Sequence, residues 1–366
     1  MRPRLRPLSL ALCVVPACQS PQADTSAFTT MPPATSESAA SSSTGTTSSM
    51  GGSSGSGFEA STTTGELSTT STSSESSSTT LILDVGADTD VGDGKPIGCE
   101  GKIDFLFVIS RYGGMSGFQE QLLDAFPKFI DTIEAKFSDF DYHIMVVDGG
   151  RLWGSDKCEA ACPMPCEWAP GYPCDYTPTT CDQAMGAGVV FPAGGFASNQ
   201  LCKIDGGRRY MVKGQTNLKD TFACAARVGG SGVAAIGEAL MTAVQPALNA
   251  PGGCNAGFLR EDALLMVTLI SNTYDPGGDP VTSNKGDPDT WMAAVRAAKH
   301  DDLESVVMLS ILRAYPECHE QDRTCQMVKM FPYHVLADRD ELDYSPFFDQ
   351  ATDLVATACA EFIPPG

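Results

Sequence analysis

The stretch IDFLFVISRYGGM, residues 103–115, decides the fold of this chain. Residues 103–109 are almost all apolar, which predicts a strand buried on both of its faces. A turn containing Gly113 and Gly114 follows, and apolar residues then recur at helical spacing over about residues 117–135. Ligands bind just beyond the carboxyl ends of the strands in an open parallel sheet, so residues 110–114 lie where a site is expected.

Strands and helices continue to alternate after this unit. Two of the helices carry the signal of a capping residue before a proline, Asp287 before Pro288 and Ser345 before Pro346. The alternation predicts an α/β fold with a doubly wound, mostly parallel sheet that is covered by helices on both faces. The expected strands are residues 142–147, 209–212, 263–270, 305–312 and 333–336, and the expected helices are residues 217–227, 233–248, 288–299 and 346–362.

The chain begins with an export signal. Residues 1–17 combine basic residues, a short apolar run and a small residue, Ala17, before Cys18. This arrangement resembles a bacterial lipoprotein signal, in which Cys18 is acylated and becomes the mature N-terminus. Ordinary secretion with cleavage nearby is the alternative. No later segment is long and apolar enough to span a bilayer.

Residues 18–98 are predicted to be a flexible stalk. Serine, threonine, glycine, alanine and proline dominate residues 19–80, and no lysine or arginine occurs between Arg6 and Lys95. Such a composition buries too little apolar surface to offset the entropy of ordering. A coil of roughly 60 residues spans about 40 Å. The folded domain is therefore expected over residues 99–366.

The cysteine pattern indicates a disulfide framework. Of the 14 cysteines, all but Cys13 and Cys18 lie within residues 99–359, and an even number in an exported chain favours up to six disulfides over metal sites. Residues 151–203 hold six of them among many glycines and prolines and are interpreted as a stapled insertion. Two pairings are suggested, a local loop between Cys318 and Cys325 and a tie between the domain ends, Cys99 and Cys359.

Charge and motifs exclude several classes of function. The formal net charge is −21, and removal of the three signal-peptide arginines makes it −24, which argues against nucleic-acid binding. Metalloprotease, hydrolase-elbow and P-loop motifs are absent from residues 99–366. His143 and His334 fall in predicted strands, where a hydrogen-bonded structural role is expected. We predict a chain without catalytic residues or cofactor.

Several segments together resemble a von Willebrand factor A domain. They are FLFVI (105–109), YHIMVV (142–147), AARVGGSG (225–232), EAL (238–240) and GFLREDALLMVTLIS (257–271). The chain is most similar to the Cys-rich, stalked A-domain lipoproteins of bacterial envelopes, over about residues 99–362. The resemblance implies a divalent cation above the first strand, held by an Asp-x-Ser-x-Ser motif, a Thr of a second loop and an Asp of a third.

The residues at the corresponding positions lack the family's carboxylates. The motif falls on Ser110, Tyr112 and Gly114, the Thr position falls on Gly230 beside Ser231, and the last Asp position falls on Asn272. Neutral oxygens alone hold Mg²⁺ poorly. Asp104 cannot substitute, since it lies six residues down the strand, about 20 Å away. We therefore expect no metal here.

Two alternatives concern charged residues at the same edge. Asp148 and Asp275 reach the same rim from other strands and form a fallback metal site. Arg111 is hypothesised to bind an acidic group of a partner through a forked hydrogen bond, and the alternative is an exposed arginine paired with a local aspartate.

The sequence thus predicts an envelope-anchored adhesion or protein-interaction module that does not use the family's cation. Its predicted binding rim comprises Ser110, Arg111, Tyr112, Gly113, Gly114, Ser231 and Asn272, and extends over residues 148–151 and 272–279. The partner is an unknown protein or surface ligand, and only a lipid anchor contacts the membrane. The expected location is the bacterial outer membrane or cell surface, otherwise the periplasm or the medium. A metal-dependent adhesion or metal-handling protein is the first alternative, and an enzyme with a site in the insertion is a remote one.

Overall fold

The computed structural model describes residues 101–136, 139–150, 152–230, 232–275, 284–313 and 318–362. The predicted signal peptide, Cys18, the stalk and Cys99 lie outside these residues. Within the described part of the chain, no helix is both long and apolar enough to cross a membrane.

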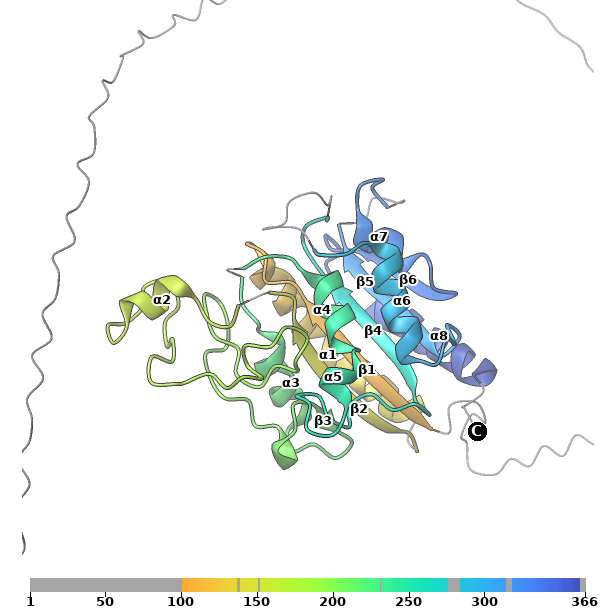
Figure 1. Ribbon diagram of the computed structural model, residues 1–366. Helices are drawn as coiled ribbons and strands as arrows, with labels where there is room; N and C mark the ends of the chain where they lie inside the picture. Colours follow the sequence, from red (N-terminus) through yellow and green to blue (C-terminus); the bar gives the residue numbers. More distant parts are fainter. Residues whose placement is uncertain are drawn as a thin grey trace, which may run out of the picture. The chain divides into compact units, whose positions relative to one another are not determined.

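A six-stranded sheet organises the domain (Figure 1). Its order is β3-β2-β1-β4-β5-β6, and every neighbouring pair is parallel except β2 and β3, which are antiparallel. The mostly parallel sheet predicted from the sequence is therefore confirmed. The strands are β1 (Lys102–Ile109), β2 (Asp141–Asp148), β3 (Met211–Val212), β4 (Leu264–Ile270), β5 (Val306–Leu312) and β6 (Tyr333–Asp338).

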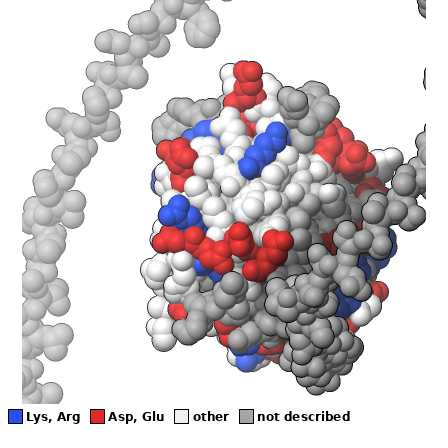
Figure 2. All heavy atoms as spheres, turned by 90° about the vertical axis from the view of Figure 1, so that its right-hand side faces the viewer, with Lys and Arg blue, Asp and Glu red and all other residues white. Residues whose placement is uncertain are grey.

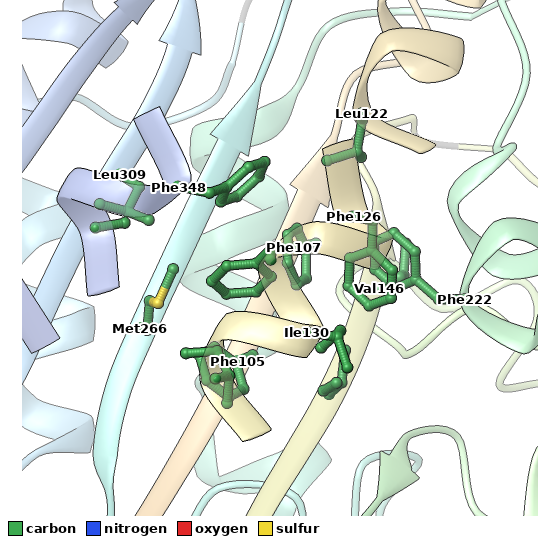
Figure 3. Packing of buried hydrophobic residues seen from close by; sticks show 14 of the residues in the cluster. Phe105, Phe107, Leu122, Phe126, Ile130, Val146, Phe222, Met266, Leu309 and Phe348 are labelled. Carbon is green, nitrogen blue, oxygen red and sulfur yellow. The ribbon is translucent and has the colours of Figure 1, made fainter. Parts of the chain in front are cut away.

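Helices cover both faces of the sheet, which makes the fold doubly wound. On one face, Phe105 and Phe107 of β1 join the core formed with α1 (Met115–Lys136), α3 (Leu218–Ala226) and α8 (Ser345–Glu361). The rings of Phe107 and Phe222 meet edge to face at 5.0 Å (Figure 3). On the other face, Leu106 and Val108 join the core with α4 (Ile236–Ala243), α6 (Pro288–Ala298) and α7 (Arg323–Val328). Two apolar cores explain the unbroken apolar run of β1.

The starts and ends of the helices match the sequence predictions only in part. Asp287 caps α6 by accepting a hydrogen bond from Thr290 N at 2.8 Å, as predicted. The predicted cap Ser345 is wrong, because Ser345 is the first residue of α8, and its amide donates to Asp343 Oδ1 at 2.8 Å. The helix expected over residues 233–248 is two helices, α4 and α5 (Pro246–Asn249), because a proline cannot continue the hydrogen bonds of α4.

The disulfides confirm the stapled insertion, which contains the helix α2 (Asp156–Ala161). The short 3-10 helix η1 (Asp205–Gly207) follows the insertion. All six cysteines of the insertion are paired. Cys359 is also disulfide-bonded, and its predicted partner Cys99 lies outside the described residues. The described pairs are Cys158–Cys166, Cys162–Cys174, Cys181–Cys254, Cys202–Cys224 and the predicted Cys318–Cys325.

Candidate functional site

The candidate site lies at the carboxyl edge of the three central strands, β2, β1 and β4. Ser110 follows β1 directly, and its amide donates to Ile270 O at the end of β4 at 2.9 Å. The Ser110 side chain is buried, and its hydroxyl accepts a hydrogen bond from Tyr112 N at 3.1 Å. The hydroxyl therefore shapes the turn after β1.

The turn from Tyr112 to Gly114 is exposed and is fastened by Asn272 from the β4 side. Asn272 Nδ2 donates to Gly113 O at 2.8 Å, and the backbone amide of Asn272 donates to Met115 Sδ at 3.2 Å. Gly114 has a φ of +85°, and a Cβ at this position would lie 3.2 Å from Asn272 Nδ2. A serine at this position would be strained, because the positive φ disfavours any residue with a Cβ and the side chain of Asn272 leaves little space.

Gln119 of α1 brings a third loop to this edge. Its side chain is buried, donates to Gly229 O at 2.8 Å and accepts from Gly229 N at 3.3 Å. The sequence contains a signal for this role that we missed. Gln119 is a polar residue within the apolar stripe of α1 that includes Met115 and Leu122, so it needs a buried hydrogen-bond partner.

Phe196, from the insertion, is a second residue that sequence reasoning missed. It is 70% exposed and adopts a φ of +63°, a left-handed conformation that is rare for an aromatic residue. A Cβ added to Gly230 would lie 3.8 Å from both Phe196 Cδ2 and the amide nitrogen of Met115. Phe196 therefore lies beside the turn that carries Tyr112, which is itself 45% exposed. Nothing in the sequence indicates that Phe196 lies beside this turn.

Arg111 does not have the role that we hypothesised for it. It is only 2% exposed, and its guanidinium donates to Asp148 Oδ2 at 3.1 Å and to three carbonyls of the insertion. Those acceptors are Leu152 O at 2.7 Å, Gly154 O at 3.0 Å and Ala193 O at 2.9 Å. Arg111 does pair with an aspartate, but Asp148 lies 37 residues away in the chain, and the expected exposure of Arg111 is wrong. Arg111 holds the insertion against the end of β1.

Both carboxylates of the fallback metal site are engaged by arginines. Asp148 pairs with Arg111, and burial raises the pKa of the Asp148 carboxyl although the Arg111 charge opposes this shift. Asp275 accepts hydrogen bonds from Arg323 Nη2 at 3.0 and 2.9 Å and from Asn284 Nδ2 at 2.7 Å. A cation at this edge would compete with two guanidinium groups already in place.

The residues at the positions where von Willebrand factor A domains, which the sequence resembles, hold their metal do not fit a divalent cation. Ser110 and Asn272 offer neutral oxygens, while Gly114 and Gly230 offer none from a side chain. Across the described ranges, no three His, Cys, Asp or Glu side chains are grouped so that they could hold a metal. Ser231, the remaining predicted rim residue, lies outside the described residues, as do Arg151 and residues 276–279.

The polar residues at the opposite edge of the sheet are structural. Asp104 is fully buried and accepts from Arg260 Nε at 2.8 Å, and burial raises its pKa to about 6. His143 Nδ1 lies 2.9 Å from Phe258 O. His334 Nδ1 similarly lies 2.7 Å from a backbone carbonyl, so the structural interpretation of both histidines is confirmed.

Comparison with known proteins gives remote likenesses of fold. No protein-family model matches the sequence, and no curated protein matches it. Similar solved structures include proximal thread matrix protein 1 from the mussel byssus, with 13% identity and a TM-score of 0.35 over 72% of this chain and 47% of that one. They also include the pilus adhesin SpaC of Lactobacillus rhamnosus GG in its open conformation, with 10% identity and a TM-score of 0.31 over 69% of this chain and 30% of that one. The chain thus spans less than half the length of either protein.

Proposed function

We propose that this chain is a noncatalytic adhesion or protein-interaction module of von Willebrand factor A type, that the rim at the carboxyl edge of β1 binds its partner, and that no divalent cation takes part. The observation that carries the proposal is the pair of exposed aromatic side chains beside the Gly113–Gly114 turn, Tyr112 and Phe196. Exposed aromatic residues on a fixed backbone are typical of the residues that dominate protein–protein binding energy.

The backbone around Phe196 supports this role. Gly230 N donates to Gly195 O at 2.9 Å, and Asn199 bonds both the amide and the carbonyl of Gly194, at 2.8 and 3.1 Å. These bonds hold a left-handed aromatic residue that costs on the order of 1 kcal/mol relative to glycine. A costly conformation that exposes an apolar ring is explained if the ring contacts a partner.

The charged groups near the rim support a noncatalytic role. Arg111 and Asp148 neutralise each other, and their hydrogen bonds go to the chain itself. The six cysteines of the insertion are all in disulfides, so none supplies a thiolate for catalysis or metal binding. This finding weighs against an enzyme site in the insertion.

Anchoring belongs to the same proposal. Acylation of Cys18 would tether the module to the bacterial envelope, and the stalk would hold it away from the membrane. Mass spectrometry of the mature N-terminus tests this part, because a diacylglyceryl cysteine at position 18 supports it and an unmodified N-terminus elsewhere contradicts it.

Two measurements on the full chain test the rim. In titration calorimetry with Mg²⁺, Mn²⁺ and Ca²⁺ we expect no saturable heat, and one bound divalent ion per chain in elemental analysis would overturn the cation-free proposal. On an array of purified secreted and surface proteins, Tyr112→Ala with Phe196→Ala should remove the signals of the unaltered chain, in chelator as well as in Mg²⁺. Leu342→Ala is the control, since Leu342 is 89% exposed and lies in the loop between β6 and α8.

A further inference from the structure

A second surface with the properties of a binding site lies in the insertion, in the lobe formed by residues 156–176. Helix α2 and the loop after it stand out to one side of the sheet (Figure 1). Two disulfides, Cys158–Cys166 and Cys162–Cys174, close this short segment, and Ala169 and Tyr172 are buried in a small core that also includes Ala193 from outside the lobe. The lobe is therefore a stiff support whose surface side chains lose little backbone freedom on binding.

The lobe exposes large apolar side chains that its small core does not use. Trp168 is 73% exposed and Met164 is 68% exposed. Met164 lines an open hollow of about 700 Å³. Prolines, aromatic rings and Met164 line it, namely Pro163, Met164, Pro165, Tyr172, Pro173 and Tyr176. An exposed tryptophan on a lobe that also carries an apolar hollow indicates a surface that a partner covers.

Acidic side chains surround these apolar groups. Asp156, Glu167 and Asp175 are exposed, and within the described ranges none of them forms an ion pair. Asp175 lines the hollow together with Met164, and Glu167 adjoins Trp168 in the chain. Lys157 is the only basic residue of the lobe, and its Nζ lies 5.8 Å from the centre of the Trp168 ring. The ring thus already receives a cation on one face.

We propose that this lobe binds a basic, apolar segment of a partner protein. Apolar side chains of the segment would fill the hollow, and its lysines or arginines would meet the three carboxylates and the open face of Trp168. Charge argues against the other occupants. The formal net charge of −21 opposes a second copy of this chain, and acidic side chains also form a band across the face in Figure 2. Nucleic acids and anionic lipid surfaces are opposed for the same reason. The proposal does not depend on the rim.

Three synthetic peptides of 14 residues serve as probes against the full chain, with the disulfides intact. The first alternates lysine with leucine, the second alternates lysine with serine, and the third alternates glutamate with leucine. We expect the lysine–leucine peptide to bind at 50 mM salt and to bind several-fold more weakly at 500 mM salt. At 50 mM salt the other two peptides should bind at least tenfold more weakly than the lysine–leucine peptide.

The variant Trp168→Ser with Met164→Ser should weaken the first peptide about tenfold or more, since truncated anchor residues have effects of this size. Leu342→Ser is the matched control, because Leu342 is exposed and lies between Glu341 and Asp343 in another part of the molecule. It should change the affinity less than twofold. All three substituted side chains are exposed, and near-UV circular dichroism checks that the fold is kept.

Each contrary outcome overturns the proposal. If the lysine–serine peptide bound as tightly as the lysine–leucine peptide, binding would depend on charge alone. If the glutamate–leucine peptide bound as tightly, binding would depend on apolar contact alone. Equal losses in the lobe variant and in the Leu342 control would place binding elsewhere. A dimer in sedimentation that Trp168→Ser abolishes would make a second copy the occupant. One further result would support the proposal: if the variant with Tyr112→Ala and Phe196→Ala binds the lysine–leucine peptide as tightly as the unaltered chain, the lobe and the rim are separate surfaces.

Discussion

Replacing Arg111 with methionine is the most direct test of how the insertion is attached to the sheet. Methionine keeps the length and the apolar stem of the side chain but removes the guanidinium. Asp148 then loses its ion pair, formed at 3.1 Å, and the carbonyls of Leu152, Gly154 and Ala193 lose the donors that now lie 2.7 to 3.0 Å away. We expect the protein to be strongly destabilised.

The magnitude follows from burial. Arg111 is 2% exposed, and the removal of one partner from a buried ion pair costs about 3–5 kcal/mol because the other charge is left uncompensated. The three carbonyls add to the loss, since a hydrogen bond to a charged group contributes about 1.5–3 kcal/mol, although such contributions are not additive. We therefore expect the free energy of unfolding to fall by at least about 3 kcal/mol.

Equilibrium urea unfolding with intact disulfides measures this loss, and Arg227→Met is the matched control. Arg227 also forms two hydrogen bonds to a carboxylate, Glu120, at 2.9 and 3.0 Å, but its side chain is 40% exposed. An exposed pair of this kind contributes less than about 1 kcal/mol. Equal losses for Arg111→Met and Arg227→Met would refute the reasoning, because they would show that burial of the Arg111 pair adds nothing.

Three further predictions concern single side chains. Burial raises the pKa of Asp322 from 3.8 to about 6, with Asp275 adding to the shift, so the folded chain binds the extra proton and stability falls as pH rises from about 4 to 6. Asp322→Asn should remove this part of the slope and raise stability at pH 7 by on the order of 2 kcal/mol. In thermal unfolding, Gly230→Thr should be nearly neutral, whereas Gly114→Ser should cost about 1–2 kcal/mol because its φ is +85°. Phe196→Gly should stabilise the fold by about 0.5–1 kcal/mol while it removes the exposed ring.

The contrary results for these variants are equally clear. An unchanged pH slope in Asp322→Asn would show that this carboxyl titrates normally. A larger loss for Gly230→Thr than for Gly114→Ser would contradict the space and the backbone conformation assigned to the two glycines. A less stable Phe196→Gly would mean that the ring, and not the left-handed backbone, dominates the energy at that position.

The fold was predictable because it follows from local patterns. The apolar runs of β1, β4 and β5 are too long and too continuous for half-exposed strands, and the intervening segments repeat at helical spacing. Some shorter elements were missed, such as α7 with its six residues, which gives too few repeats of the helical period to detect. The break between α4 and α5 was visible in Pro246 but was outweighed by the apolar pattern around it.

The site was less predictable because its contacts span long distances in the sequence. The position of the rim followed from topology, since parallel strands end at one edge. The burial and the hydrogen bonds of Arg111 could not be predicted, because its acceptors lie 37 to 82 residues away in the chain. Phe196 was missed for the same reason, since nothing in its own neighbourhood shows that it lies beside Gly230.

The sequence by itself determined the class of the sheet, the location of the candidate site after β1 and the lack of carboxylates at the positions where von Willebrand factor A domains, which it resembles, hold their cation. Each of these depends on residue type and short-range spacing. Only the tertiary structure decided what the charged and aromatic residues do. Arg111 donates its hydrogen bonds to the insertion and to Asp148. Asp148 and Asp275 each pair with an arginine. Phe196 lies at the rim, beside Gly230. The physical reason is that a side chain's role depends on its burial and its partners, and the fold supplies these partners from distant segments.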